Sequence, residues 1–491
     1  MRAFLKKGIP LKIFALLLLA AFILALLPML KAGQYDVPSA DDYSNGLDTY
    51  RAWERTGSLR EVFRTSFKRV SSLYYSWQGT FTAIFLFTLN PMIFGEQYYQ
   101  IGFYLVLGML LAGIFVLAFT VWSRIYKASK HESLIIALGW AILCTQFLPR
   151  ASQGLYWYVG AVYYTFFFGL AALAYSLLLR YIYRDEGSSG LGKLITATLL
   201  LFLVGGGNLV TGLTTAVLLA TMELLLVLRH NKAWKPLLIP AFAFYAAFLI
   251  NVSAPGNAVR QKHFAQPGLI SSVFISFEEM GKFALQWFSL PVLALMVMLI
   301  PVFWRIASRY ERRFPLPGLV SLYSICLSGV MFYAPVYAMT AHNLDHLGRI
   351  TNIIFFGMMF LAMFNLYYWI GWLYQHGRLT ENHFAGAAKG RYSLACLLLT
   401  LLLFGFGMTQ IKWFDVTSIS AFRSYRSGEL GSYYHTYKGR LEILKDPEVK
   451  DAVLKRYPCR PYVLYFQDLS PSAAKNRVIA EWYEKDSVVI R

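Results

Sequence analysis

Long runs of apolar residues, separated by short polar segments, fill most of the chain up to about residue 411. A run of about 20 apolar residues is long enough to cross a bilayer as an α-helix. The pattern predicts an all-α polytopic membrane protein with about eleven transmembrane helices. The predicted spans are residues 10–30, 101–123, 134–149, 159–180, 193–209, 210–229, 236–251, 283–304, 317–335, 350–374 and 392–411.

The polar loops between these runs predict the orientation. Alternate loops are rich in Lys and Arg, and the loops between them are poorer. Because cytoplasmic loops carry an excess of basic residues, we expect the basic loops and the N-terminus to be cytoplasmic. Arg2, Lys6 and Lys7 precede a first span that lacks a cleavage site and is interpreted as uncleaved. The basic loops cover residues 124–133, 181–192, 230–235, 305–316 and 375–391.

The first external loop, residues 31–100, is predicted to be long. Its segment 75–94 is apolar enough to cross, but a crossing would invert every later loop, so a re-entrant or surface-lying helix is expected there. The alternative is that residues 75–94 form a true second span and that one of the later predicted spans is wrong, which would restore the orientation of the basic loops. Arg60, Arg64 and Lys68 recur every four residues, which fits either a helix face for anionic headgroups or phosphates, or a solvated face.

The hydrophobic runs end near residue 411, which divides the chain into a transmembrane domain, 1–411, and a C-terminal domain, 412–491. With an odd number of spans the second domain lies outside the cell. Residues 462–466 are typical of a strand, and residues 471–485 are typical of a helix. We therefore expect a small extracytoplasmic α/β domain.

Composition supports the membrane assignment. Of the 491 residues, 57% are hydrophobic and only 15% are charged, whereas soluble domains carry about 25% charge. The formal net charge of +20 arises mainly from basic residues in short loops, which the membrane orientation explains. We therefore expect no nucleic-acid partner. The four cysteines form no CxxC pair, so neither a disulfide framework nor a zinc site is indicated.

Candidate chemistry gathers in the external loops. Asp41 and Asp42 follow the first span, and either could act as a general base or be a solvated loop charge. Aromatic rings can stack on sugar faces, and arginine binds phosphate oxygens through its forked donors. Each residue also has a plainer explanation, as an interfacial aromatic, a turn or a helix end. The candidate substrate-binding residues are Trp77, Trp157, Tyr158, Asn257, Arg260, His342, His346 and Arg349.

Together these residues match glycosyl transfer from a lipid-linked phosphosugar. A carboxylate pair could also hold Mg²⁺ or Mn²⁺, but nothing else in the sequence supports a metal or another cofactor. Glu223 is the clearest acid within a predicted span, and this scarcity counts against a proton-coupled transporter. A flippase or a polymerase of lipid-linked oligosaccharides remains the alternative.

Five short motifs carry a family resemblance. They are Asp41-Asp42-Tyr43, Trp77-x-Gly79, Tyr156-Trp157-x-x-Gly160-x-x-Tyr163, Pro255-Gly256-Asn257-x-x-Arg260 and Asn476-x-x-x-Ala480-x-x-Tyr483. In their order along the chain they resemble the GT-C superfamily of membrane glycosyltransferases, and more closely a bacterial polytopic family with an Asp-Asp-Tyr motif in the first loop. The chain departs from that family at Thr80, where Arg is frequent, and at Leu209, where Glu is common.

The resemblance implies a polyprenyl-phosphate-sugar donor and inverting transfer to a glycan or lipid acceptor at the outer face of the bacterial inner membrane. It implies that Asp41 or Asp42 is the catalytic base. We expect Arg260 and Arg349, with His342 or His346, to stabilise the leaving phosphate, and Trp157 and Tyr158 to hold the sugar.

Overall fold

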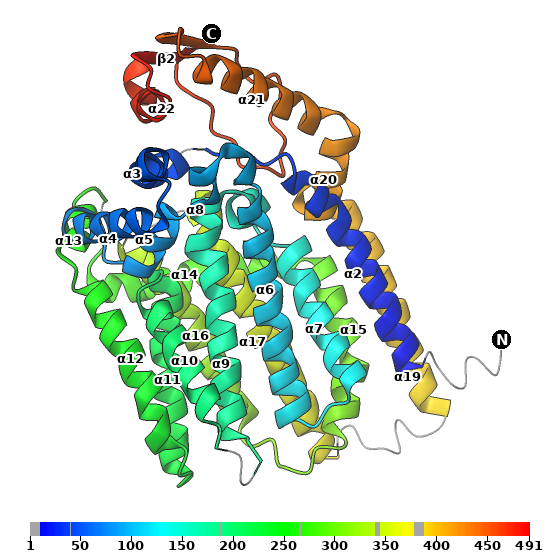
Figure 1. Ribbon diagram of the computed structural model, residues 1–491. Helices are drawn as coiled ribbons and strands as arrows, with labels where there is room; N and C mark the ends of the chain where they lie inside the picture. The colour runs from blue at the N-terminus through cyan, green and yellow to red at the C-terminus, as the bar shows by residue number, and fades with distance from the viewer. Residues whose placement is uncertain (1–9, 40, 186–188, 265–266, 339–343, 378–386) are drawn as a thin grey trace.

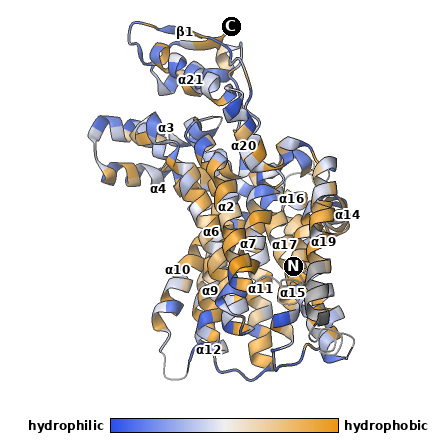
Figure 2. Cartoon of the chain, turned by 90° about the vertical axis from the view of Figure 1, so that its right-hand side faces the viewer, coloured by the Kyte–Doolittle hydropathy of each residue, from blue (hydrophilic) through white to orange (hydrophobic). Residues whose placement is uncertain are grey.

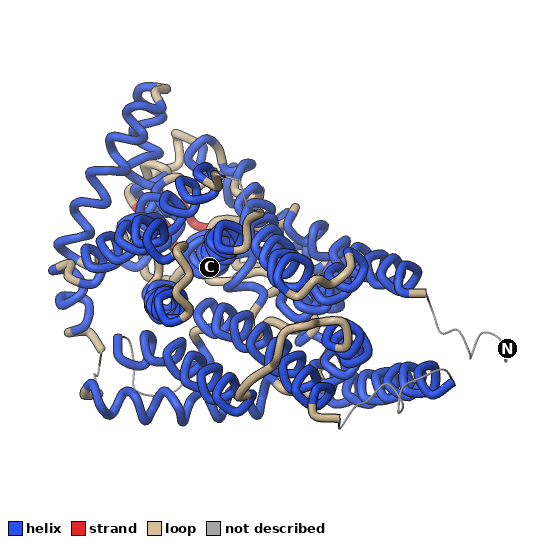
Figure 3. The backbone as a smooth tube through the Cα atoms, turned by 90° about the horizontal axis from the view of Figure 1, so that it is seen from below, coloured by secondary structure: helices blue, strands red, loops and turns tan. Residues whose placement is uncertain are grey.

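The computed structural model describes residues 10–39, 41–185, 189–264, 267–338, 344–377 and 387–491, and side chains of 387–394 are not described. Its helices form a bundle, and a layer of shorter helices and the C-terminal segment covers one end (Figure 1). Figure 2 shows that apolar residues dominate the bundle and that polar residues gather at its two ends. Seen from below, the bundle is helical throughout (Figure 3).

Eight helices of the described chain are long and apolar enough to cross a membrane, which confirms a polytopic helical protein. Two of them contain a π-helical segment: α6 (Ile101–Phe119) ends in η3 (Thr120–Ile125), and α8 (Tyr158–Ala161) continues through η5 (Val162–Phe166) into α9 (Phe167–Ile182). The other six are α2 (Leu11–Gly33), α11 (Leu209–Leu228), α12 (Trp234–Val252), α15 (Leu290–Ala307), α16 (Pro317–Ala338) and α17 (Gly348–Gln375).

The remaining predicted spans coincide with shorter apolar helices. α7 (Lys130–Gln146) has 17 residues and α10 (Leu191–Gly205) has 15. In α19 (Ala387–Gln410) the apolar part is Ala395–Gln410. The total of eleven crossings therefore stays a prediction.

The predicted span at 283–304 has the wrong boundaries. A break at Phe288 and Ser289 separates α14 (Leu269–Trp287) from α15, whose first turn contains Pro291, a residue favoured at that position. The sequence pattern does not predict α14, because Glu278, Glu279 and Lys282 interrupt its apolar residues. Figure 2 shows this helix nearly end on, so it runs across the axis of the bundle.

The first loop folds into three helices: α3 (Asp41–Thr56), α4 (Leu59–Ser76) and α5 (Phe81–Thr88). The eight residues of α5 rise only about 12 Å, far less than the roughly 30 Å of hydrocarbon. Residues 77–80 break the segment between α4 and α5, and a short 3₁₀ helix, η1 (Pro91–Phe94), follows. The break and the short helices fit a surface-lying or re-entrant segment, and its position relative to the membrane stays a prediction.

Small residues let helices of the bundle approach closely. A side chain at Gly113 of α6 would lie 2.6 Å from the backbone oxygen of Gly169 in α9. Close approach through small residues is a usual device in membrane helices, where apolar burial between helices adds little. Trp140 of α7 donates its indole N–H to the backbone oxygen of Phe356 in α17 at 3.1 Å. These contacts fix the scaffold that carries the covered end.

Contacts link the predicted cytoplasmic loops with one another. The guanidinium of Arg124, after α6, donates to the backbone oxygen of Tyr183, after α9, at 2.8 Å. Arg309, after α15, pairs with the buried carboxylate of Glu132 at the start of α7. These loops share the end of the bundle opposite α3 (Figure 1). The described parts of the basic loops 124–133, 181–192 and 305–316 therefore lie together, and their cytoplasmic position stays a prediction.

The C-terminal segment lies over α3 (Figure 1). It contains η7 (Trp413–Asp415), α20 (Thr417–Arg426), α21 (Glu429–Lys445), η8 (Ala473–Asn476) and α22 (Arg477–Trp482). Strands β1 (Asp451–Leu454) and β2 (Ser487–Ile490) pair in parallel, with Asp451 opposite Ser487. The strand predicted at 462–466 is wrong: that segment is an irregular loop. The helix predicted at 471–485 is present but shorter.

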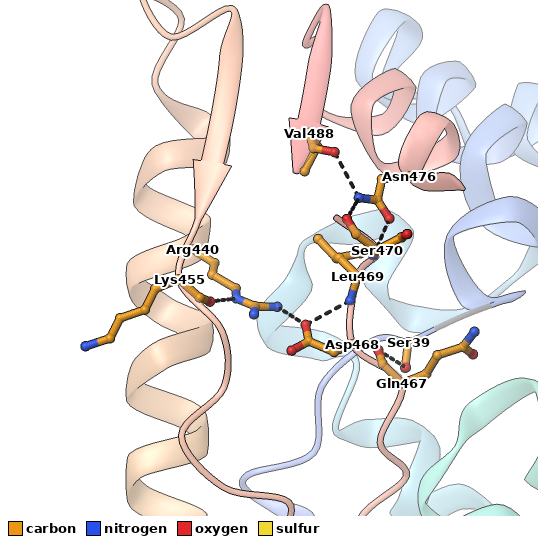
Figure 4. Close-up of polar contacts among 9 residues, drawn as sticks. All are labelled: Ser39, Arg440, Lys455, Gln467, Asp468, Leu469, Ser470, Asn476 and Val488. Carbon is orange, nitrogen blue, oxygen red and sulfur yellow. Dashed lines mark hydrogen bonds and ion pairs between the residues drawn. The ribbon is translucent and has the colours of Figure 1, made fainter. Parts of the chain in front are cut away.

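Two polar side chains hold this irregular loop (Figure 4). Arg440 of α21 donates to the backbone oxygen of Lys455 and to the carboxylate of Asp468, both at 2.8 Å. The amide of Asn476 donates to the backbone oxygens of Ser470 and Val488 at 2.7 and 2.9 Å. The loop between these anchors is therefore placed by the segment itself, and it faces the bundle.

Candidate functional site

The first turn of α3 is fixed by Asp42. Its side chain is fully buried and accepts hydrogen bonds from the Ser39 N–H at 2.9 Å, the Tyr99 hydroxyl at 2.8 Å and the Val159 N–H at 3.2 Å. Burial raises the pKa of Asp42 to about 7, although these donors oppose the shift. Asp42 thus joins three segments, and no substrate can reach it without moving them.

Asp41 precedes this residue and is exposed. The pKa of its carboxyl is raised, because the protein around it removes part of its hydration, and the positive charges of Arg349 and then Arg260 oppose this shift. Its backbone oxygen accepts hydrogen bonds from the side chains of Ser44 and Asn45 at 3.1 and 2.8 Å. These two side chains therefore bind the backbone of Asp41 and not its carboxylate. Of the two adjacent acids, Asp41 is the one that a ligand can reach.

Arg349 lies in the first turn of α17 and contacts two aromatic side chains. Its guanidinium is 5.3 Å from the ring centre of Trp157, and it lies beside the hydroxyl of Tyr164. The indole of Trp157 is stacked on Tyr465 with 4.5 Å between ring centres and an angle of 10°. Tyr465 comes from the irregular C-terminal loop, so that segment forms one wall of the site. The stack buries Trp157, which limits how much of its ring a sugar could contact.

Arg260 approaches from the short helix α13 (Pro255–Gln261). It donates to the side-chain oxygen of Gln78 and lies 5.7 Å from the ring centre of Trp77, which is 39% exposed. Its Nε is buried and has no hydrogen-bond partner among the described residues. A half-buried guanidinium with unused donors can bind an anionic oxygen.

Two glycines bring the Trp77 and Arg260 segments together. A side chain at Gly79 would lie 1.9 Å from the backbone oxygen of Asn251, and one at Gly256 would lie 2.5 Å from the Trp77 nitrogen. The side-chain oxygen of Asn257 accepts from the Gly79 N–H at 3.0 Å. The motifs Trp77-x-Gly79 and Pro255-Gly256-Asn257-x-x-Arg260 therefore form one clamp.

Several predicted substrate-binding residues have structural partners instead. Tyr158 is buried, and its hydroxyl donates to the backbone oxygen of Leu86 at 2.9 Å. Asn257 uses its amide N–H groups to donate to the backbone oxygens of Asn251 and Val252. Both residues position segments around Asp41. His346 is exposed in η6 (Leu344–His346), and His342 lies outside the described residues.

The structure brings together five residues that the sequence predicts for the site, namely Asp41, Trp77, Trp157, Arg260 and Arg349. It adds three that the sequence analysis missed, namely Gln78, Tyr164 and Tyr465. Gln78 stands inside the motif Trp77-x-Gly79, so its position was a usable signal. Tyr465 falls in the run 462–466 that predicted a strand, and its distance along the chain from Trp157 left no local signal for the stack.

Among the described residues, no group of three or more His, Cys, Asp or Glu side chains could hold a metal ion. No protein-family model, no curated protein and no solved structure matches the chain. The arrangement of side chains around Asp41 is therefore the basis for assigning a function.

Proposed function

We propose that the protein is an integral-membrane glycosyltransferase that moves a sugar from a polyprenyl-phosphate donor to a glycan or lipid acceptor, with inversion. The observation that carries the proposal is the convergence of one accessible carboxylate, Asp41, with Arg260 and Arg349 at one end of an apolar bundle. A base beside two cations suits a reaction in which a hydroxyl loses a proton and a phosphate leaves.

In the proposed reaction, Asp41 takes the proton of the acceptor hydroxyl. The oxygen then attacks the anomeric carbon from the face opposite the phosphate. The bond between that carbon and the phosphate oxygen breaks, and the polyprenyl phosphate leaves with the bonding electrons. Arg260 and Arg349 stabilise the charge that develops on the phosphate, and the exposed ring of Trp77 offers an apolar face to the sugar.

The orientation belongs to the same proposal. The basic loops lie together at the end opposite Asp41, which favours a cytoplasmic position for those loops and the N-terminus. The Asp41 site and the C-terminal segment would then face the outside of a bacterial inner membrane. A lipid-linked donor could enter this site from the outer leaflet.

The test is sugar transfer in membranes from cells that express the protein, supplied with radiolabelled polyprenyl-phosphate hexoses. Wild type is compared with Asp41→Asn at matched expression. Glu442→Gln, an exposed acid on α21, is the matched control. We expect label to reach an acceptor with wild type and the control, and a loss of at least about 100-fold with Asp41→Asn.

Near-wild-type transfer by Asp41→Asn would remove the proposed base. Movement of lipid-linked sugar across the bilayer without transfer, and without dependence on Asp41, would support a flippase instead. Extension of a diphosphate-linked oligosaccharide would support a polymerase.

A further inference from the structure

A large cleft lies between the first-loop helices and the C-terminal segment. Its volume is about 880 Å³, and its walls come from α3, α4 and residues 444–450 and 481–485. Seven basic and four acidic side chains line it among the described residues. The cleft is thus polar and carries an excess of positive charge.

Some of these cations are already neutralised. Arg69 lies 3.9 Å from the carboxylate of Asp48, and Lys445 pairs with Glu96 at 2.7 Å. Lys68 and Lys450 are exposed and have no ion-pair partner within the described parts of the chain. The cleft therefore offers positive charges that no protein group neutralises.

Arg55 adds a third cation. It uses its Nε to donate to the backbone oxygen of Arg51 at 3.1 Å, and its side chain lies at the exposed surface of α3. The two terminal nitrogens of a guanidinium can bind a carboxylate or phosphate in a forked geometry.

The cleft continues the Asp41 site along one side of α3. Asp41, Asp48 and Arg55 are seven residues apart, which is close to two helical turns, so they lie along the same face. Asp48, at the edge of the cleft, is about 10 Å along the helix from Asp41. A chain bound in the cleft along this face would direct one end toward Asp41.

An aromatic pair forms part of the wall. Tyr50 of α3 is stacked on Trp482 of α22 with 4.2 Å between ring centres. This stack and the bond from Arg51 to the backbone oxygen of Glu481 at 3.0 Å join the two sides of the cleft. The cleft is thus built by contacts between segments far apart in the sequence.

We propose that this cleft binds an anionic glycan, a sugar chain that carries carboxylate or phosphate groups, as the acceptor. The acceptor role rests on the proposed function, whereas binding of the anionic chain does not. Lys68, Lys450 and Arg55 contact its charged groups, and its end extends along α3 to Asp41.

Binding is measured with the full-length protein in nanodiscs of zwitterionic lipid. The probes are polygalacturonate, which carries carboxylates, long-chain inorganic polyphosphate, and neutral dextran. The cleft variant is Arg55→Gln/Lys68→Gln/Lys450→Gln. The control, Lys455→Gln/Arg456→Gln/Lys475→Gln, removes the same charge from exposed residues outside the cleft.

We expect wild type and the control to bind an anionic probe, dextran not to bind, and the cleft variant to bind about tenfold more weakly or worse. Preference for polygalacturonate or polyphosphate would identify the charged group. Equal weakening in the two variants, or no binding by wild type, would overturn the proposal.

Transfer assays separate the two proposals. If wild type transfers sugar, the cleft variant should raise the acceptor KM with little change in kcat, and an unchanged KM would overturn the acceptor role. If no transfer occurs but binding depends on the cleft, the transferase proposal fails and the anionic-glycan site stands.

Discussion

The backbone N–H of Gly79 donates a hydrogen bond at 3.0 Å to the side chain of Asn257, which lies 178 residues later in the chain. This bond joins the segment after α4 to the start of α13. Trp77 and Arg260, on the two joined segments, then face one another beside Asp41. The geometry of the site therefore depends on a contact that contains no proposed reacting group.

Gly79→Ala should lower sugar transfer by at least about tenfold, because the new methyl group would lie 1.9 Å from the backbone oxygen of Asn251 and would separate the segments. Gly108→Ala is the control, since no atom lies within 4 Å of the added carbon. Transfer is measured at matched expression. Equal activity in the two variants would contradict the clamp.

Asp42→Ala should destabilise the protein by about 2–4 kcal/mol, because it leaves the Tyr99 hydroxyl and two backbone N–H groups buried without an acceptor. Asp41→Asn should leave stability within about 0.5 kcal/mol of wild type, since its side chain is exposed. Thermal unfolding in detergent compares the two. Similar unfolding temperatures would show that Asp42 has no structural role.

Stability should also depend on the ionisation of Asp42. The folded-state pKa of about 7 lies above the unfolded value of about 4, so the folded state binds more protons between these values. The contribution of this group to stability is therefore lost as pH rises from about 4 to 7. Asp42→Asn, which does not titrate, should show a weaker pH dependence of unfolding in this range. If the pH dependence of unfolding is the same in Asp42→Asn and wild type, groups other than Asp42 cause it.

The fall of the transfer rate at low pH should reflect the protonation of Asp41. The base must be ionised, so transfer should fall as pH falls through the pKa of Asp41. Arg349 lowers that pKa, and Arg349→Gln should therefore move the midpoint to higher pH, whatever its effect on the maximum rate. Arg64→Gln, on the exposed face of α4, should leave the midpoint in place. A shift to lower pH in Arg349→Gln would contradict the charge arrangement.

Tyr465→Ala should lower transfer by about tenfold, because it removes the ring stacked on Trp157 and with it one wall of the site. Tyr465→Phe keeps the ring and should retain most of the activity. If both variants behave like wild type, the C-terminal loop does not contribute to the site.

Hydrophobic length and loop charge are enough to predict the scaffold. Most spans, the clustering of basic loops and the short helix within residues 75–94 follow from periodicity and the positive-inside rule. The boundary between α14 and α15 does not, because a polar break at Ser289 is invisible to a window that averages hydropathy. The strand expected at 462–466 is absent because its apolar residues belong to a loop packed between other segments.

The composition of the candidate site could be predicted, but the roles of its residues could not. Sequence order indicates Asp41, Arg260 and Arg349, which lie at the ends of spans. It does not separate Asp41 from Asp42, because the burial of Asp42 depends on segments that approach from elsewhere in the chain. For the same reason, it does not assign Asn257 to backbone contacts.

The bond from Arg51 to Glu481 also has a consequence for biosynthesis. These residues are 430 positions apart, so a ribosome that adds about 5–20 residues per second needs roughly 20–90 s between them. During that interval most membrane helices can already be inserted while α3 lacks its cover. A chain that stops before Tyr465 would reach the membrane without the ring stacked on Trp157 and without the wall of the cleft at residues 481–485, so transfer activity should depend on synthesis of the C-terminal segment.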